Sequence, residues 1–451
     1  MKRVLGIIIV SIVFLNCSSD SGGDTIVKPP VENLKPVAVA DVGTTIEDEP
    51  ININLLSNDT VITGSSITSF DANSANGGTV EDNRNGTFTY TPAANFVGTD
   101  TFNYTLCDND PTPDCSTTTV TITITDEGSP SASDDQVNTV KNVTIVINDY
   151  AQNDSTIDDA NIETVDASGA SGTVIINNDG TISYTPQTDF IGDDSFTYTI
   201  CDDDTPNPTC ATATITVSVL EPITFNNIPA AISAYYSTLP ISTDTDLNFT
   251  FVSNHTSDKH TTILSYGERH GFLYDADEDA ANTANVILMY NSESRDEREY
   301  TSGNNPHSPQ TFNTEHVYPQ SRLNADDAVT DLHHLRSCDA NVNSNRSNFP
   351  FVDASGTFEL INGNSWYPGD EWKGDVARMI MYLNVRYGET FEKVGTLNLF
   401  LEWNAADPVS AFELQRNAII QGAQGNRNPF IDNPYLATLI WGGTPAENRW
   451  E

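Results

Sequence analysis

Two patterns of hydrophobic and polar positions divide the chain near residue 220. Before that point, short stretches such as TFTYTP (87–92) and DTFNYTL (100–106) alternate threonine with aromatic or β-branched residues. A period of two places one face of a strand in a core and the other face in water. The NG, DG and TP pairs between these stretches are typical turn residues. The first half of the chain is therefore predicted to be all-β.

After residue 221, helical spacing replaces this alternation. In DVARMIMYLNVRYG, the apolar residues recur at three- and four-residue intervals, at Val376, Ile380, Leu383 and Tyr387. This stripe predicts a helix packed on a core, with Gly388 as its natural end. In DPVSAFELQRNAIIQG, we predict a helix with Asp407 as N-cap, Pro408 at the first helical position and Gly422 at its end. The C-terminal region, residues 225–445, is predicted to be α+β and mainly helical.

The β-rich half contains an internal repeat. The stretch GTVEDNRNGTFTYTPAANFVGTDTFNYTLCD returns as GTVIINNDGTISYTPQTDFIGDDSFTYTICD, and equivalent residues lie 94 positions apart, as in Tyr90/Tyr184, Phe102/Phe196 and Cys107/Cys201. A period of this size corresponds to a whole β-sandwich domain. We predict two such domains, at residues 36–125 and 130–220. They resemble the tandem immunoglobulin-like or cadherin-like repeats of bacterial surface proteins, and their lack of histidine indicates that they are spacers.

The N-terminus has the pattern of an export signal. A basic MKR precedes the apolar run VLGIIIVSIVFL, which is short for a membrane span. The following LNCSS resembles a bacterial lipoprotein box, which implies cleavage after residue 16 and a membrane anchor on the lipid-modified Cys17. Residues 18–35, rich in Ser, Gly, Asp and Pro, are predicted to be a flexible tether. An ordinary secretory signal is the alternative. The sequence leaves open whether the protein stays at the outer membrane or cell surface, lies in the periplasm or is released.

Export permits disulfides, and the cysteine spacing is consistent with them. Cys107 and Cys115 enclose one short acidic loop, and Cys201 and Cys210 enclose a similar one, so we predict two local bridges. Cys338 is left over and is interpreted as a buried thiol. The acidic residues of these loops are interpreted as solvated turns rather than as calcium ligands, because no loop has the spacing of a recognised calcium site.

The formal net charge of −43 is strongly acidic and unevenly spread. Residues 1–220 contain 6 Lys and Arg against 32 Asp and Glu, and the remainder contains 14 against 31. Such a surface repels polyanions and by itself argues against avid nucleic-acid binding.

Three stretches of the C-terminal region are dense in groups that bind metals, phosphates or protons: NTEHVYPQSRL, DLHHLR and NVNSNRSNFPF. Hydrolysis of a phosphodiester needs a base for water and a cation for the charge that develops on oxygen. Mg²⁺ prefers carboxylate and amide oxygens, and histidine is the usual base. Glu315, Asn343 and His316 supply these groups. If NVNSNRSN is helical, Asn343 and Arg346 share a face, and Arg346 is placed to bind a phosphate.

These stretches, in this order, resemble the endonuclease I family of secreted bacterial nucleases, whose active site is a ββα-metal (His-Me) finger. The flanking YDADEDAANTANVILMY and QGNRNPFIDNPYLATLIWG match as well. The resemblance implies His316 as general base, with Glu315 and Asn343 as ligands of Mg²⁺ or of another divalent cation such as Mn²⁺ or Ca²⁺. It also implies an arginine that contacts the scissile phosphate. Only 14 residues separate His316 from Asp331, so Arg322, Arg336 and Arg346 remain candidates for that arginine.

The resulting hypothesis is a lipid-anchored, extracytoplasmic, sugar-nonspecific endonuclease. It would hydrolyse DNA, with RNA as a second substrate class, to 5′-phosphate and 3′-hydroxyl ends, without a nucleotide cofactor and in an oligomeric state that the sequence leaves open. One alternative is a non-catalytic, adhesin-like protein that acts through its repeats. Another is a Zn²⁺ hydrolase built on His333 and His334, but no HExxH-type spacing occurs. We interpret these two histidines as structural residues, and Asp331 as an N-cap.

Overall fold

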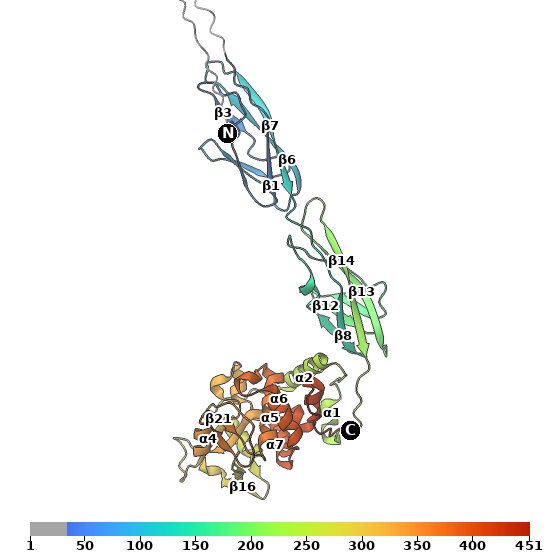
Figure 1. Ribbon diagram of the computed structural model, residues 1–451, viewed down its shortest axis with the longest axis vertical. Helices are drawn as coiled ribbons and strands as arrows, with labels where there is room; N and C mark the ends of the chain where they lie inside the picture. Colours follow the sequence, from blue (N-terminus) through green and yellow to red (C-terminus); the bar gives the residue numbers. More distant parts are fainter. Residues whose placement is uncertain (1–33) are drawn as a thin grey trace, which may run out of the picture. The chain divides into compact units, whose positions relative to one another are not determined.

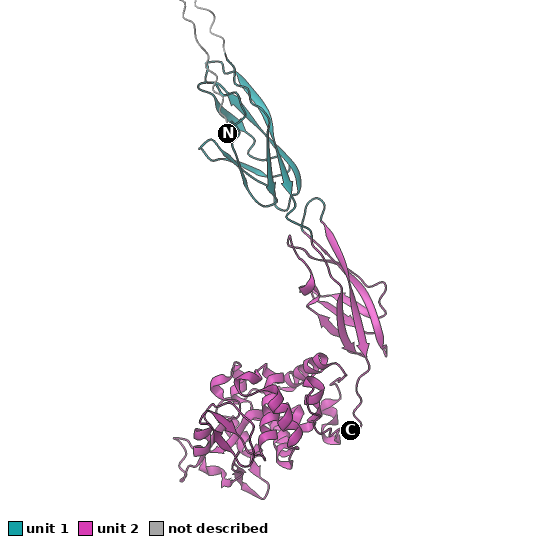
Figure 2. Ribbon diagram, in the orientation of Figure 1, with its two compact units in different colours: residues 1–129, 203–208 teal, residues 130–202, 209–451 magenta. Residues whose placement is uncertain are grey.

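The computed structural model describes residues 34–451 (Figure 1). They group into two compact units (Figure 2). The first holds the described residues up to Ser129 together with residues 203–208, and the second holds residues 130–202 and 209–451. The predicted signal peptide, its Cys17 and most of the predicted tether lie outside the described residues. Within residues 34–451, no helix combines the length and the apolar character needed to cross a bilayer.

The first repeat consists of two sheets with strand orders β1-β7-β6-β3 and β2-β5-β4. Its strands are β1 (Asp41–Ile46), β2 (Ile51–Ile53), β3 (Ser66–Phe70), β4 (Thr79–Asp82), β5 (Phe88–Thr91), β6 (Gly98–Cys107) and β7 (Cys115–Thr125). Strand β1 runs parallel to β7, whereas β6 and β7 are antiparallel. Along β6 the side chains of Phe102, Tyr104 and Leu106 are buried, which confirms the predicted period of two.

The second repeat has the same design, with sheets β10-β13-β14-β8 and β11-β12-β9. Its strands are β8 (Asp135–Val140), β9 (Ile145–Ile147), β10 (Asn161–Asp166), β11 (Thr173–Ile176), β12 (Ile182–Thr185), β13 (Gly192–Cys201) and β14 (Cys210–Leu220). Strand β8 runs parallel to β14. The two copies also share core contacts. Tyr90 stacks on Phe102 and donates a hydrogen bond to Asp100 (2.7 Å), and Tyr184 does the same with Phe196 and Asp194 (2.7 Å).

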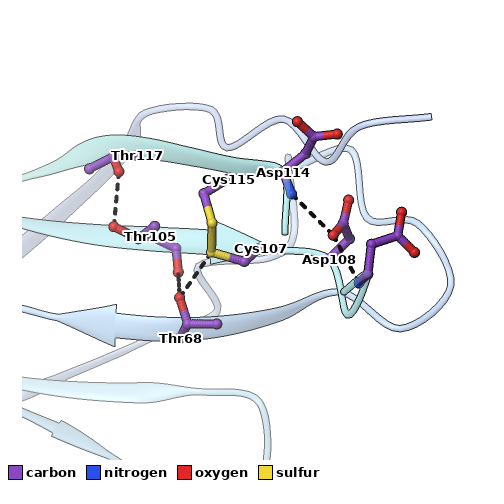
Figure 3. The surroundings of a disulfide bond; sticks show 8 residues. Thr68, Thr105, Cys107, Asp108, Asp114, Cys115 and Thr117 are labelled. Atoms are coloured by element: carbon purple, nitrogen blue, oxygen red, sulfur yellow. Dashed lines mark hydrogen bonds between the residues drawn. A yellow bond between two sulfur atoms is a disulfide. The ribbon is translucent and has the colours of Figure 1, made fainter. Parts of the chain in front are cut away.

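Both predicted disulfides are present, Cys107–Cys115 and Cys201–Cys210. Figure 3 shows the first bridge joining the ends of β6 and β7. The buried carboxylate of Asp108 in that loop accepts hydrogen bonds from the backbone N–H groups of Asp110 (3.2 Å) and Asp114 (3.1 Å). The carboxylate thus closes its own loop and is buried, so the interpretation of this loop's acidic residues as solvated is wrong for Asp108. Cys338 is a buried free cysteine, as predicted.

Reduction is expected to weaken the repeats and spare the C-terminal region. Each bridge closes a short loop, with sequence separations of 8 and 9 residues, and is expected to stabilise its repeat by about 2 kcal/mol. Differential scanning calorimetry with and without reductant measures the effect. Thiol counting on denatured protein that lacks residues 1–17 should find one free thiol, Cys338. Five thiols in unreduced protein would contradict the pairing.

The C-terminal region is mainly helical. Its helices are α1 (Ala230–Tyr236), α2 (Thr245–Lys259), α3 (Arg269–Ala276), α4 (Ala340–Arg346), α5 (Lys373–Tyr387), α6 (Leu397–Ala406), α7 (Ala411–Gln424), α8 (Pro429–Asp432) and α9 (Tyr435–Trp441). Its strands are β15 (Glu278–Asp279), β16 (Asn282–Ile287), β17 (Ser294–Asp296), β18 (Phe312–His316), β19 (Leu335–Asp339), β20 (Glu359–Ile361) and β21 (Ser365–Tyr367). They form the sheets β15-β16-β17, β18-β19 and β20-β21.

Helix α5 forms the centre of this core and packs against α2, α6 and α8. The predicted stripe residues Val376, Ile380 and Leu383 are buried. The helix ends as predicted at Gly388, which adopts the left-handed conformation (φ 69°) that favours glycine.

The second predicted helix starts later than its sequence indicated. Helix α7 begins after Ser410, whose side chain and that of Glu413 form a capping box. Asp407 was therefore wrongly predicted as the N-cap. Its carboxylate instead accepts a hydrogen bond from the backbone N–H of Gly374 (2.9 Å), at the start of α5. Gly422 lies inside α7, which continues to Gln424.

Strands β18 and β19 and helix α4 carry the three stretches singled out in the sequence. The strands are antiparallel, and Glu315 pairs with Arg336 in their register. Helix α4 follows β19 directly and packs against both strands. Asp339 caps the helix by accepting hydrogen bonds from the N–H groups of Asn341 (2.8 Å) and Val342 (3.1 Å). This strand–strand–helix arrangement brings the end of β18 beside α4.

A candidate active site at the end of strand β18

A small open pocket of about 170 Å³ lies where β18 ends beside α4. Three of its lining residues are those predicted from the sequence to act together: Glu315, His316 and Asn343. The other lining residues are Thr314, Pro319, Gln320, Ser321, Ser347 and Asn348. Neighbouring strand residues normally face opposite sides. Glu315 and His316 reach one pocket because β18 ends at His316, just before Pro319.

Glu315 is a buried carboxylate with one oxygen engaged. The residue is only 2% exposed, and its Oε1 accepts a hydrogen bond from the hydroxyl of Tyr290 (2.9 Å). Arg346 Nε lies 3.3 Å from the same oxygen. The two groups form an ion pair, but their geometry is not that of a hydrogen bond. Burial raises the pKa of Glu315 to about 7, although Arg346 and Tyr290 oppose the shift. Within residues 34–451, Oε2 accepts no hydrogen bond, so this carboxylate suits a cation in the pocket.

His316 is held in one tautomer by the backbone. Its Nε2 lies 3.1 Å from the carbonyl oxygen of Val329, and a carbonyl can only accept a hydrogen bond. Nε2 therefore carries the proton, and Nδ1 keeps its lone pair. Burial, with smaller contributions from His334 and Arg269, lowers the pKa of His316 to about 3. The imidazole is thus neutral at pH 7, with the lone pair of Nδ1 free.

Asn343 presents its oxygen to the pocket. Its amide nitrogen donates hydrogen bonds to Asn313 Oδ1 (2.8 Å) and to the carbonyl oxygen of Thr314 (3.1 Å). Both acceptors lie on β18, so these bonds fix the side chain against the strand that carries Glu315. The amide oxygen accepts no hydrogen bond within the described part of the chain. A hard cation binds carboxylate and amide oxygens of this kind.

A buried polar network fixes the segment that holds His316. Asp331 accepts hydrogen bonds from Tyr382 (2.7 Å), Tyr387 (2.9 Å), Gln424 (3.0 Å) and the backbone N–H of His333 (2.9 Å). The last bond confirms Asp331 as an N-cap. His334 Nε2 donates to the carbonyl oxygen of Ala328 (2.6 Å). His333 and His334 are fully buried, and these contacts keep the Val329 carbonyl in place.

Arg336 and Arg346, predicted as phosphate-binding residues, are fully buried. The guanidinium of Arg336 pairs with Asp277 (3.0 Å) and stacks over the Trp372 ring at 4.7 Å. Arg346 donates to the carbonyl oxygens of Phe349 (2.6 Å) and Val317 (3.0 Å). A direct contact with a phosphate does not fit this placement, because each buried guanidinium is already paired with a carboxylate, Arg336 with Asp277 and Arg346 with Glu315. Arg322, the third candidate, donates to the carbonyl oxygen of Lys393.

Sequence reasoning missed Tyr290 and the Val329 carbonyl. Tyr290 adopts a left-handed backbone conformation (φ 74°), which is uncommon for a residue other than glycine. That conformation brings its hydroxyl to Glu315. Tyr290 ends the flanking stretch YDADEDAANTANVILMY, but no local pattern distinguishes it from a core tyrosine. The Val329 carbonyl leaves no sequence signal, since every residue has one.

Comparison with known proteins identifies the family of the C-terminal region. The family model for endonuclease I matches residues 250–435. An extracellular ribonuclease of Bacillus amyloliquefaciens is 41% identical over 205 residues, which cover 40% of this chain and 69% of the relative. The chain belongs to the endonuclease I family. A second extracellular ribonuclease, from Bacillus subtilis (strain 168), is 40% identical over 205 residues, which again cover 40% of this chain and 69% of the relative.

Relatives named for a different substrate also match. An extracellular deoxyribonuclease of Aeromonas hydrophila is 30% identical over 112 residues, or 23% of this chain and 49% of the relative. The bacterial Ig domain matches twice, at residues 33–125 and 127–218. The chain therefore combines two immunoglobulin-like domains with an endonuclease I region, and its relatives support nuclease activity for that region.

Proposed function

We propose that this protein is a metal-dependent, sugar-nonspecific endonuclease that acts outside the cytoplasm on DNA and RNA. The observation that carries the proposal is the shared pocket of Glu315, His316 and Asn343. It combines a neutral imidazole with two oxygen ligands that accept no hydrogen bond from residues 34–451. Relatives named as ribonucleases and as a deoxyribonuclease support both substrate classes.

Each pocket residue has a distinct part in the proposed reaction. Glu315 Oε2 and Asn343 Oδ1 would hold a divalent ion such as Mg²⁺, which supplies positive charge for the phosphate and for the leaving 3′-oxygen. His316 Nδ1 takes the proton from the attacking water, while Nε2 stays bonded to Val329. The water attacks phosphorus in line with the leaving oxygen, so the 5′-phosphate remains on the product. In this proposal β18, β19 and α4 form the ββα-metal finger.

Arg346 and Arg336 are assigned to positioning. Arg346 pairs with Glu315 Oε1 and ties the end of α4 to the chain after β18 through the Val317 carbonyl. Arg336 holds β19 through Asp277. We propose that both arginines keep the pocket in shape without contacting the substrate.

The test of this function is direct. Purified protein is incubated with plasmid DNA and with ribosomal RNA, in Mg²⁺ and in excess chelator. Cleavage of both substrates in Mg²⁺ and none in chelator is expected. Intact substrates under every condition would instead favour the adhesin-like alternative.

Replacing Tyr290 by phenylalanine should weaken metal binding selectively. The change removes one hydrogen bond that orients Glu315 and leaves the ring in place. Loss of such an orienting bond typically lowers metal affinity 10- to 100-fold, so the Mg²⁺ concentration for half-maximal activity should rise about tenfold, with kcat at saturating Mg²⁺ nearly kept. Tyr367→Phe is the matched control, because its hydroxyl donates to Asp370 outside the pocket. An unchanged Mg²⁺ requirement in Tyr290→Phe would remove Tyr290 from the metal site.

The nuclease region should act without the repeats. We propose domains at residues 36–125, 130–220 and 225–445. The hydrophobic cluster around α5 extends slightly beyond the last of these, from Ile223 to Trp450, and therefore lies within the residues that the deletion keeps. Deleting residues 18–220 should therefore leave the cleavage of free DNA within about a factor of three, an order-of-magnitude expectation for separable domains. Circular dichroism and a cooperative melt establish folding. A folded but inactive product would show that the repeats do more than space the nuclease.

The predicted membrane anchor remains a proposal. Relatives named as extracellular and periplasmic nucleases support export, and mass spectrometry of the mature N-terminus tests for lipid on Cys17.

A further inference from the structure

A row of aromatic rings lies at helix α3, beside strand β18. His270 and Tyr274 are four residues apart on α3, so they share one helix face, and Tyr266 lies in the turn just before the helix. Their ring centroids lie 6.2 Å and 6.1 Å apart, and Tyr300 continues the row 5.7 Å from Tyr274. Tyr274 also contacts Phe312, the first residue of β18, at 5.7 Å. We call these four rings, Tyr266, His270, Tyr274 and Tyr300, the aromatic row.

The row begins over a buried arginine that lacks an acidic partner. Arg269 is 1% exposed, and its guanidinium lies 3.5 Å from the centre of the Tyr266 ring. Its Nε makes no hydrogen bond, and its other nitrogens make two long ones, to the Val329 carbonyl (3.5 Å) and His270 (3.4 Å). Within residues 34–451, no carboxylate forms an ion pair with Arg269. A buried cation without a counter-charge is costly, so this position favours the arrival of an anion.

Arg269 also connects the row to the proposed active site. The Val329 carbonyl that holds His316 Nε2 at 3.1 Å is the same oxygen that Arg269 Nη1 approaches. Arg269 therefore links the row to the proposed base: its guanidinium contacts the Tyr266 ring and approaches the carbonyl oxygen that holds His316. Tyr266 is 57% exposed, and neighbouring Glu268 and Asp275 are exposed acidic residues on the same segment. Of the four rings only Tyr266 is exposed, and His270, Tyr274 and Tyr300 are half-buried. A ligand would therefore bind this surface by stacking on Tyr266 more than by charge.

We propose that the aromatic row binds the unpaired bases of single-stranded nucleic acid next to the phosphate that is cleaved. Every base has a face that can stack on an aromatic ring, whatever its sequence, and bases within a duplex are already stacked on each other. The backbone phosphate beside the stacked bases supplies the negative charge that Arg269 lacks. This inference rests on the proposed nuclease function and adds to it a preference for single strands.

Binding without cleavage tests the row. The full chain with His316→Ala is titrated with fluorescent 12-nucleotide single strands of DNA and RNA, an abasic single strand and a 12-base-pair duplex, and Kd is read by anisotropy. Tyr266→Ala should weaken binding of the base-containing single strands about tenfold, the order expected for one stacked base. Tyr266→Phe should restore it, and the duplex and the abasic strand should bind unchanged. Arg269→Gln should flatten the dependence of log Kd on log salt by about 0.7, which corresponds to one phosphate.

Phe272→Ala is the matched control, since Phe272 is an exposed aromatic residue of α3 outside the row. It should bind all ligands as the parent does. Equal single-strand affinity in Tyr266→Ala and the parent, or an equal loss for duplex and single strand, overturns the inference. Failure of the nuclease function is seen separately, as absence of cleavage by the chain with His316 intact. If that chain cleaves while the row variants bind normally, only the inference fails.

Discussion

The His316→Ala variant should lose a factor on the order of 10² to 10⁴ in kcat, the usual contribution of a positioned base. Metal affinity should stay nearly unchanged, because His316 is assigned to the water and not to the ion. The structure sharpens this expectation, since the Val329 carbonyl occupies Nε2 and leaves only Nδ1 to accept a proton. Single-turnover cleavage of a labelled oligonucleotide at saturating Mg²⁺ measures the chemical step.

Variants of two other histidines serve as controls for this result. His307→Ala alters a histidine outside the pocket and should have no effect. His334→Ala removes the side chain that fixes the Ala328 carbonyl, so it should lower the rate less than His316→Ala does. A His316→Ala variant with normal kcat would exclude the residue as the base.

Replacement of Glu315 should have the second large effect, which is mainly on the Mg²⁺ requirement of the enzyme rather than on kcat. In Glu315→Gln the side chain keeps its shape but loses the charge that would hold the ion. The Mg²⁺ concentration for half-maximal activity should rise at least about tenfold, because changes to residues that only orient metal ligands already cost 10- to 100-fold in affinity. Part of the rate should return at high Mg²⁺. Asn343→Ala should behave in the same way, more weakly, since an amide ligand carries no charge.

Isothermal titration with Mg²⁺ separates the two roles without any turnover. Glu315→Gln should lose measurable heat of binding, and His316→Ala should keep it. The opposite outcome, with binding lost in His316→Ala and kept in Glu315→Gln, would show that base and ligand are assigned the wrong way round.

The sequence alone was sufficient wherever the decisive signal is local. The period of two along β6 and the helical stripe of α5 follow from contacts within one element, so their pattern is written in adjacent residues. The pairing of Cys107 with Cys115 required only a short loop between two strands. Asp407 shows the limit of local reasoning. Its position before Pro408 resembles an N-cap, but the residue bonds to Gly374 of another helix, and Ser410 takes the cap.

The candidate site shows the same division. The order of the three polar stretches was enough to select Glu315, His316 and Asn343 and to indicate the family. Their burial and partners were not predictable. Arg346 is on the predicted helix, but tertiary packing turns its guanidinium inward, onto backbone carbonyls and Glu315. A helical pattern predicts the helix face from which a side chain projects. The position of its terminal group depends on what packs against that face.

Residues far apart in the sequence meet only in the folded chain. Tyr290 reaches Glu315 across 25 positions, Tyr382 reaches Asp331 across 51, and Arg269 approaches the Val329 carbonyl across 60. The sequence by itself determined the domain types, the family and the three residues assigned to chemistry, because these follow from composition, periodicity and ordered motifs. Only the tertiary structure decided which oxygen of Glu315 is engaged, which nitrogen of His316 keeps its lone pair and which arginine lacks a counter-ion. Each of these depends on the burial of a polar group beside a partner that no local pattern specifies.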